Sequence, residues 1–197
     1  MKRNKSNQVV ILASRSPRRV ELLKQVGIEC ILLPADIDES VKQGEKPENY
    51  VKRLAKEKAL TAASSMKREY SHLVILAADT TVSLNEWILG KPENDEIAYN
   101  MLKQLSGKKH IVHTAVAACH KGKVKVVLST TTVDMMRLTP DAIRTYIASG
   151  EHRDKAGSYG IQGKAAAWIK HIEGSYSGVM GLPLFETMQL IHKIAST

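Results

Sequence analysis

The sequence has few cysteines, few aromatic residues and few acidic residues, and each shortage narrows the class of protein. Its two cysteines, Cys30 and Cys119, stand far apart, so they match neither a zinc-ligand spacing nor a redox pair. We interpret both as reduced core thiols. Aromatic residues make up 5% of the 197 residues, with a single Phe, which disfavours a protein that stacks on single-stranded nucleic acid.

Long hydrophobic runs are also missing. Apolar stretches such as residues 73–78 fall far short of the roughly 20 residues that a membrane span needs, so we predict no membrane partner. The basic residues 1–5 resemble the start of a signal peptide, but the apolar run behind them ends at Ala13, which is too short for one. We therefore predict a cytoplasmic protein.

Positive charge is what the chain has in excess. Lys and Arg number 29 against 20 Asp and Glu, which gives a formal net charge of +9. A surplus of this kind predicts a polyanionic partner, whether nucleotide, nucleic acid or anionic membrane surface. The length, the 43% hydrophobic content and the 25% charged content fit a globular protein of one domain, or of one domain with a small lobe.

The start of the chain predicts a strand, a tight turn and a helix. Residues 9–13 are apolar, Pro17 suits a first helical position, and Ser16 before it is a candidate N-cap. The free N–H groups of a helix N-terminus attract anions, and Arg15, Arg18 and Arg19 crowd the same place. We predict a polyphosphate site here; a surface turn whose arginines face water is the alternative.

Further patterns along the chain alternate between strand and helix. We expect strands over 28–33, 73–78, 82–89 with a turn at Asn85 and Glu86, 110–119, 124–135 and 165–172. We expect helices over 48–63, 96–105 with Asp95 as its cap, 140–149, and 184–194. Early alternation followed by a hairpin predicts a mixed sheet with helices on its faces.

Asp79 is a second candidate for chemistry, because it follows the buried apolar run 73–78 and ligands sit at strand ends in open α/β sheets. It can serve as a metal ligand or a general base; an ordinary turn aspartate is the alternative. Glu39 lies in an acidic loop, and magnesium bound with phosphates takes one or two such carboxylates. Lys58 and Lys91 lie near element ends, where a lone lysine is more often a solvated charge.

Several motifs, in their order along the chain, resemble the Maf family of nucleoside triphosphate pyrophosphatases. They are LASRSPRR (residues 12–19), ADTTV (78–82), LGKP (89–92) and DKAGSYGIQG (154–163), extended by HTAVA (113–117) and GLPL (181–184). The resemblance covers essentially the whole chain. It implies an inosine-triphosphatase-like (Maf/Ham1) α/β fold, with a long twisted mixed sheet flanked by helices, in which residues 1–197 form a single domain of two lobes around one cleft.

The resemblance also implies roles for individual residues. Asp79 falls on the family's catalytic base, and Glu39 and Asp79 fall on its ligands for a divalent cation, Mg²⁺ or Mn²⁺. Substrate binding is carried over to Ser14, Ser16, Arg18, Arg19, Lys58, Thr80, Lys91 and Gln162. Arg18, Thr80 and Gln162 match the specificity set of the pyrimidine subgroup, and an amide both donates and accepts, as the edge of uracil or thymine requires.

The activity that the resemblance implies is hydrolysis of dTTP and UTP, with modified pyrimidine triphosphates as further substrates, to the monophosphate and pyrophosphate by a homodimer. Two alternatives stay open. One is a nucleic-acid-binding or cell-division (septum) regulator, which the net charge favours but the placing of the key charges at strand ends disfavours. The other is a pyrophosphatase for a purine triphosphate.

Overall fold

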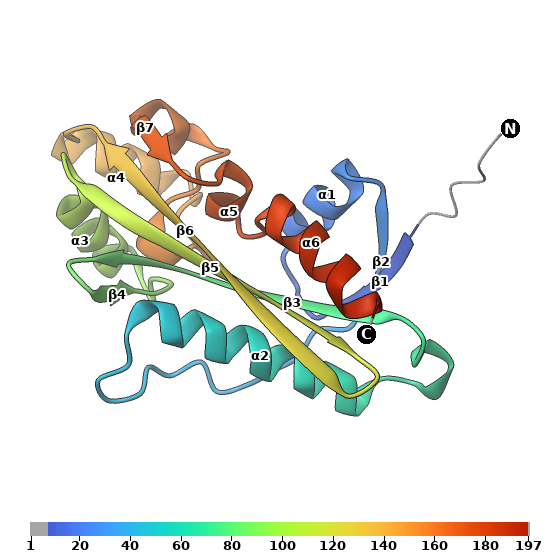
Figure 1. Cartoon of the computed structure of the whole chain (residues 1–197). Coiled ribbons are helices and arrows are strands. Elements are labelled where there is room, and N and C mark those ends of the chain that lie inside the picture. The colour runs from blue at the N-terminus through green and yellow to red at the C-terminus, as the bar shows by residue number, and fades with distance from the viewer. Residues whose placement is uncertain (1–7, 197) are drawn as a thin grey trace, which may run out of the picture.

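The computed structural model describes residues 8–196, whose strands form one seven-stranded sheet flanked by helices (Figure 1). The strands are β1 (Gln8–Leu12), β2 (Ile28–Leu32), β3 (Val74–Leu84), β4 (Trp87–Leu89), β5 (Lys109–His120), β6 (Lys123–Met135) and β7 (Ile169–Glu173). The helices are α1 (Pro17–Gln25), α2 (Pro47–Ser65), α3 (Asp95–Leu105), α4 (Pro140–Ala148), α5 (Tyr176–Met180) and α6 (Leu184–Ala195), with 3₁₀ turns η1 (Arg68–Tyr70), η2 (Ala156–Ser158) and η3 (Lys164–Trp168).

The sheet is mixed, as the sequence predicts. Its order is β2-β1-β3-β5-β6-β7, and β4 pairs separately with β3. β1 pairs in parallel with β2 and β3, while the ladders of β3 with β5, β5 with β6 and β6 with β7 are antiparallel. Three long strands, β3, β5 and β6, cross the molecule and connect its two ends (Figure 1). Within residues 8–196, every helix is too short or too polar to span a bilayer.

Side-chain size decides how close the helices come to the two faces of the sheet. On one face, Ala55 and Ala59 of α2 share a buried cluster with Ala77, Ala115 and Ala117 of β3 and β5. Alternate strand residues point to the same face, so this run of alanines lets α2 pack directly against the backbone. On the other face, α1, α5 and α6 cover one half of the sheet and α3 and α4 cover the other half.

β3 is longer than the sequence indicates, and this corrects the expected position of Asp79. Asp79 lies in the middle of β3, opposite Ala115 of β5, and not at a strand end. The second edge of β3 pairs with β1 over Val74–Leu76 and with β4 from Val82. Between these two ladders, residues 77–81 meet no strand of the described chain on that edge, so a gap in the sheet takes the place of the expected strand end.

Local predictions are confirmed in most places and wrong in two. Asn94, not Asp95, caps α3, because its side chain accepts from the Ile97 N–H. The expected strand over 165–172 begins at Ile169, because the residues before it form η3. The prediction that Ser16 precedes α1 at the N-cap position is confirmed, although its side chain makes no cap bond. The hairpin turn at Asn85 and Glu86 is confirmed, with both residues at positive φ.

Gly157 gives a test of how η2 packs against β3. Its φ is +67°, and an added Cβ would lie 2.9 Å from Cγ2 of Val82. Gly157→Ala therefore carries both left-handed strain and overpacking, and we expect it to lower the free energy of unfolding by about 2–4 kcal/mol. Gly122 has φ +76° and open space around it, so Gly122→Ala should cost about 1 kcal/mol. Urea denaturation of both variants measures the difference; equal losses would contradict this packing.

Candidate functional site

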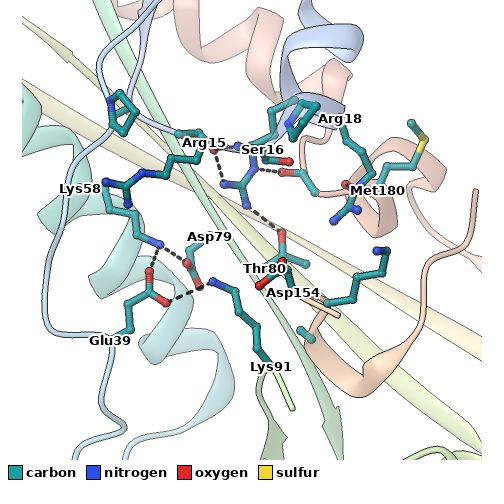
Figure 2. Close-up of a pocket in the computed structure, with 18 of the residues that line it drawn as sticks. Arg15, Ser16, Arg18, Glu39, Lys58, Asp79, Thr80, Lys91, Asp154 and Met180 are labelled. Carbon is teal, nitrogen blue, oxygen red and sulfur yellow. Dashed lines mark hydrogen bonds and ion pairs between the residues drawn. The ribbon is translucent and has the colours of Figure 1, made fainter. Parts of the chain in front are cut away.

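A pocket of about 740 Å³ opens at the gap in the edge of β3 (Figure 2). Separate parts of the chain line it: the turn into α1, the loop after β2, Lys58 of α2, β3, Lys91, Val112 of β5, residues 154–161 around η2, and the end of α5. Its cationic lining residues are Arg15, Arg18, Arg19, Lys58, Lys91 and Lys155, and its acidic ones are Asp36, Glu39, Asp79 and Asp154.

Lys58 lies between two carboxylates that line the pocket, those of Asp79 and Glu39. Its Nζ is 2.7 Å from Oδ1 of Asp79 and 2.6 Å from Oε1 of Glu39. Lys91 approaches the other oxygen of Glu39 at 3.6 Å (Figure 2). The side chains of Lys58 and Asp79 are about a tenth exposed, while that of Glu39 is 41% exposed. The chain therefore holds a buried acid–base pair with a second, more accessible carboxylate beside it.

Burial and neighbouring charges act in opposite directions on the pKa of each of the two carboxylates, Asp79 and Glu39. Burial raises the pKa of Asp79 above its ordinary value, although the charge of Lys58 opposes this rise. Partial burial also acts to raise the pKa of Glu39, but Lys58 and Lys91 outweigh it and lower the value overall. Glu39 is thus fixed as an anion, while Asp79 is the group better suited to take up a proton.

Arg19 of α1 links the turn before α1 to β3 on the face of the sheet opposite to Asp79. Its guanidinium donates to Oγ of Ser14 at 3.0 Å, to the carbonyl of Gly181 at 2.8 Å and to Oγ1 of Thr80 at 3.5 Å. Burial lowers the pKa of Arg19, and the neighbouring Arg18 adds to that effect. Since Asp79 and Thr80 are adjacent strand residues, they point to opposite faces, and the pocket has an acidic side and an arginine side.

Charged residues from other elements also line the pocket. Arg15 forms a bidentate ion pair with Asp36 at 2.5 and 2.9 Å, which ties the loop after β2 to the turn before α1. On the other side, burial and the charge of Arg18 lower the pKa of Lys155. The sequence gives Arg15 as an arginine of the turn but carries no sign of its partner, because Asp36 comes from a separate loop.

The structure brings together nine of the ten residues singled out from the sequence. Ser14, Ser16, Arg18, Arg19, Glu39, Lys58, Asp79, Thr80 and Lys91 all line the pocket. Gln162 does not: it is exposed and follows Ile161, which is a lining residue. The prediction of its specificity role stays a prediction. Apolar lining residues outside the quoted motifs include Val112, Val179 and Met180.

The carboxylates of Asp79 and Glu39 fit a magnesium or manganese ion that takes its other ligands from a bound phosphate. Both carboxylates supply hard oxygen donors, and an oxygen of each lies within 2.7 Å of Lys58 Nζ, so the two are close together. Such an ion is commonly bound by one or two carboxylates together with oxygens of the substrate. In the described part of the chain no group of three or more His, Cys, Asp or Glu residues is placed to hold a metal. An all-protein cage is therefore not built from residues 8–196.

Comparison with known proteins decides the family. The pattern of the family described as Maf-like protein matches residues 9–194. The chain belongs to the Maf family. This membership confirms the resemblance that the ordered motifs carry, and the observed mixed sheet with flanking helices agrees with the predicted fold class.

Relatives within the family are close. The chain is 52% identical to the dTTP/UTP pyrophosphatase of Methylobacillus flagellatus, over 92% of this chain and 90% of that one. It is 50% identical to the protein of the same name from Nitrosomonas europaea, over 93% of each, and 48% identical to that from Pseudoalteromonas atlantica, over 95% and 97%. Among solved structures, the Staphylococcus aureus Ham1 protein matches with a TM-score of 0.40 at 14% identity, over 65% of this chain and 72% of that one.

Replacement of Lys58 tests the electrostatic description of the pocket. Because Lys58 lowers the pKa of both carboxylates it contacts, Lys58→Gln should raise the pKa of Asp79 further and raise that of Glu39. Carboxyl-carbon NMR titration measures both values directly. Lys56→Gln removes the same charge from an exposed position on α2 and should leave both values unchanged. An unchanged or lower pKa of Asp79 in Lys58→Gln would contradict the assignment.

Proposed function

We propose that this protein is a nucleoside triphosphate pyrophosphatase that converts dTTP and UTP to the monophosphate and pyrophosphate. The single observation that carries the proposal is the buried Asp79–Lys58 pair at the gap in β3, surrounded by cationic side chains. The relatives named dTTP/UTP pyrophosphatase support the substrate class, since the chain spans at least 90% of each of the three compared.

The charges of the pocket suit a triphosphate. Six cationic and four acidic side chains of the described chain line it, so it has a surplus of positive charge even with every carboxylate ionised. Arginine and lysine bind phosphate oxygens through charge-assisted hydrogen bonds, and the apolar lining of Val82, Val112 and Met180 gives a place for a nucleoside. We propose that the phosphates lie between the arginine side and Lys91, with the base toward Tyr159.

In the proposed reaction, a water oxygen attacks the α-phosphorus and the bond from that phosphorus to the bridging oxygen breaks. Asp79 takes the proton of the water, and pyrophosphate leaves with the bridging oxygen. Arg18, Arg19 and Lys91 stabilise the charge that spreads over the phosphate oxygens in the transition state. The charge of Lys58 opposes the rise in the pKa of Asp79 that burial causes, and so favours the ionised carboxylate.

A divalent cation completes this proposal. Asp79 and Glu39 would hold it, and when bound it supplies Lewis-acid polarisation of the phosphate and neutralises charge on the leaving pyrophosphate. Arg18, Thr80 and Gln162 are proposed to select pyrimidines. We further propose a single domain over residues 1–197, a homodimer, no nucleic-acid or membrane partner, and a cytoplasmic location beside the nucleotide pools that such an enzyme clears.

A nucleotide panel tests the activity. Purified protein is given dTTP, UTP, CTP, GTP and 7-methyl-GTP with magnesium or manganese, and phosphorus NMR identifies the products. We expect dTTP and UTP to be hydrolysed fastest and to give monophosphate and pyrophosphate. Release of orthophosphate with a diphosphate would contradict the site of cleavage, and a preference for GTP would favour the purine alternative.

Asp79→Asn tests the catalytic base. The amide cannot take up a proton, so we expect turnover of dTTP to fall by about 10²–10⁴-fold while the nucleotide still binds. Asp134→Asn is the matched control, because Asp134 also pairs with a lysine, Lys170 at 3.1 Å, but lies outside the pocket lining. The raised pKa of Asp79 predicts that wild-type activity falls on acidification at a pH above that of an ordinary aspartate. Near-normal turnover by Asp79→Asn would refute the assignment.

A further inference from the structure

Of the two carboxylates that contact Lys58, that of Glu39 is the one with no regular secondary structure to hold it. Asp79 is fixed in β3, and Lys58 is fixed on α2, but Glu39 lies in the loop of residues 33–46, which contains neither helix nor strand. The same loop contributes Pro34, Ala35, Asp36 and Ile37 to the pocket lining. A reactive geometry has to be held within a fraction of an ångström, so this loop needs restraints of its own.

Two side chains of α2 supply such restraints by binding the backbone around Glu39. The hydroxyl of Tyr50 donates to the carbonyl oxygen of Glu39 at 2.9 Å. The guanidinium of Arg53 donates to the carbonyl oxygen of the next residue, Ser40, also at 2.9 Å. Two consecutive carbonyl groups are thus held by two residues spaced three apart on one helix, where side chains are neighbours.

Arg53 is itself held firmly. Its fork binds both oxygens of Glu45 at 2.7 and 2.8 Å, and it contacts Glu57 at 3.3 Å. The side chains of Arg53 and Glu45 are only 16% and 9% exposed, and the guanidinium lies 5.7 Å from the ring centre of Tyr50. Hydrogen bonds from Arg53 lower the pKa of Glu45, so the pair stays ionised. Because Ser40 and Glu45 both belong to this loop, Arg53 ties the second half of the loop to α2.

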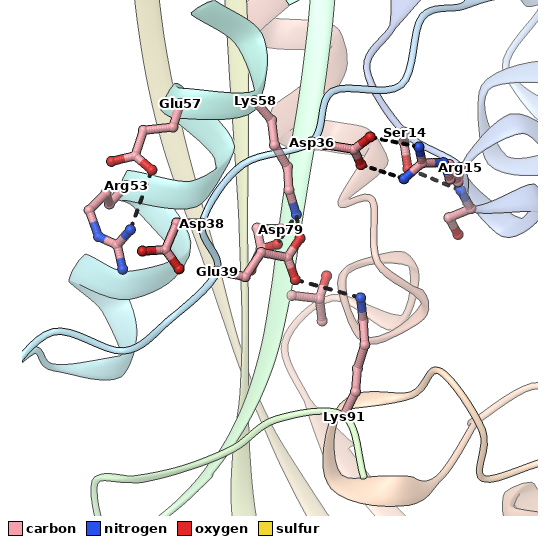
Figure 3. A network of polar contacts seen from close by, with 12 residues as sticks. Ser14, Arg15, Asp36, Asp38, Glu39, Arg53, Glu57, Lys58, Asp79 and Lys91 are labelled. Atoms are coloured by element: carbon pink, nitrogen blue, oxygen red, sulfur yellow. Dashed lines mark hydrogen bonds and ion pairs between the residues drawn. The ribbon is translucent and has the colours of Figure 1, made fainter. Parts of the chain in front are cut away.

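The helix that holds the backbone of Glu39 also binds its carboxylate. Figure 3 shows Arg53 and Lys58 reaching from α2 toward the loop that carries Asp38 and Glu39, with the carboxylate of Glu39 turned to Lys58. α2 thus fixes Glu39 at both ends, through Tyr50 and Arg53 at the main chain and through Lys58 at the side chain.

We propose that Tyr50 and Arg53 are positioning residues that set the place of Glu39 beside Asp79 without touching the substrate. Neither lies among the pocket-lining residues. The inference rests on the proposed function for its kinetic effect, but the restraint on the loop is a property of the folded chain alone. Loss of the restraint should therefore loosen the loop and slow the reaction together.

Hydrogen exchange tests the restraint without any substrate. Tyr50→Phe removes one hydroxyl and Arg53→Lys keeps the charge but loses the fork. In peptides that cover residues 36–46 we expect exchange about five- to tenfold faster in each variant than in the wild type. The matched controls are Tyr99→Phe and Arg144→Lys, since Arg144 lies 5.8 Å from the ring centre of Tyr99 and pairs with Asp141 at 3.0 Å, outside the pocket.

A double-mutant cycle tests the route through Glu39. Tyr50→Phe should lower kcat/KM for dTTP by about tenfold in the wild-type background and by less than about twofold in Glu39→Gln, because the carboxylate that it positions is gone. A merely structural role would give the same factor in both backgrounds. Equal factors, or unchanged exchange in the loop, would overturn the proposal. If the wild type hydrolyses no pyrimidine triphosphate, the proposed function fails, and the exchange result still decides whether Tyr50 and Arg53 hold the loop.

Discussion

One ammonium group between two carboxylates determines how the rest of the pocket is arranged. Asp79 is buried beside Glu39, and two like charges in a poorly solvated place repel each other unless a cation lies between them. Lys58 can reach that place because α2 packs close to the sheet, which the alanines of both surfaces allow. The chemistry of the site thus depends on a run of small core residues that take no part in it.

The interruption in the sheet explains why so buried a carboxylate is accessible. Asp79 is fixed along one edge of β3 by pairing with β5, while the other edge is open between β1 and β4. A residue in mid-strand has less freedom than one at a strand end, so the open edge gives access without mobility. Its neighbour Thr80 faces the opposite side and meets Arg19. The strand therefore presents the carboxylate of Asp79 and the hydroxyl of Thr80 from adjacent residues on opposite faces.

Features with short-range causes could be predicted from the sequence, and features with long-range causes could not. Pro17 and the pair Asn85 and Glu86 act on their own neighbourhoods, and the elements they mark are present. The length of β3 is set by its partner β5, so the polar residues from Asp79 onward gave no sign that the strand continues. The contacts of Tyr50 and Arg53 were missed because their acceptors are carbonyl groups, which every residue carries. Nine of the ten predicted site residues line the pocket, including Glu39 and Lys58, which lie outside the quoted motifs, while Gln162 lies within a motif and is nevertheless exposed.

The surplus of positive charge in the pocket carries a cost that an anionic ligand would remove. Burial is the main cause that lowers the pKa values of Arg19 and Lys155, and the charge of Arg18 lowers both further, because neighbouring cations repel one another. Arg19 offsets part of this through its hydrogen bonds to Ser14 and Gly181, which also fix the direction of its guanidinium. Groups that are held in place against repulsion do not need to reorganise when charge develops on a bound phosphate, and this preorganisation is what stabilises a transition state. The surplus of positive charge in the pocket therefore favours the binding of an anion over that of a neutral molecule.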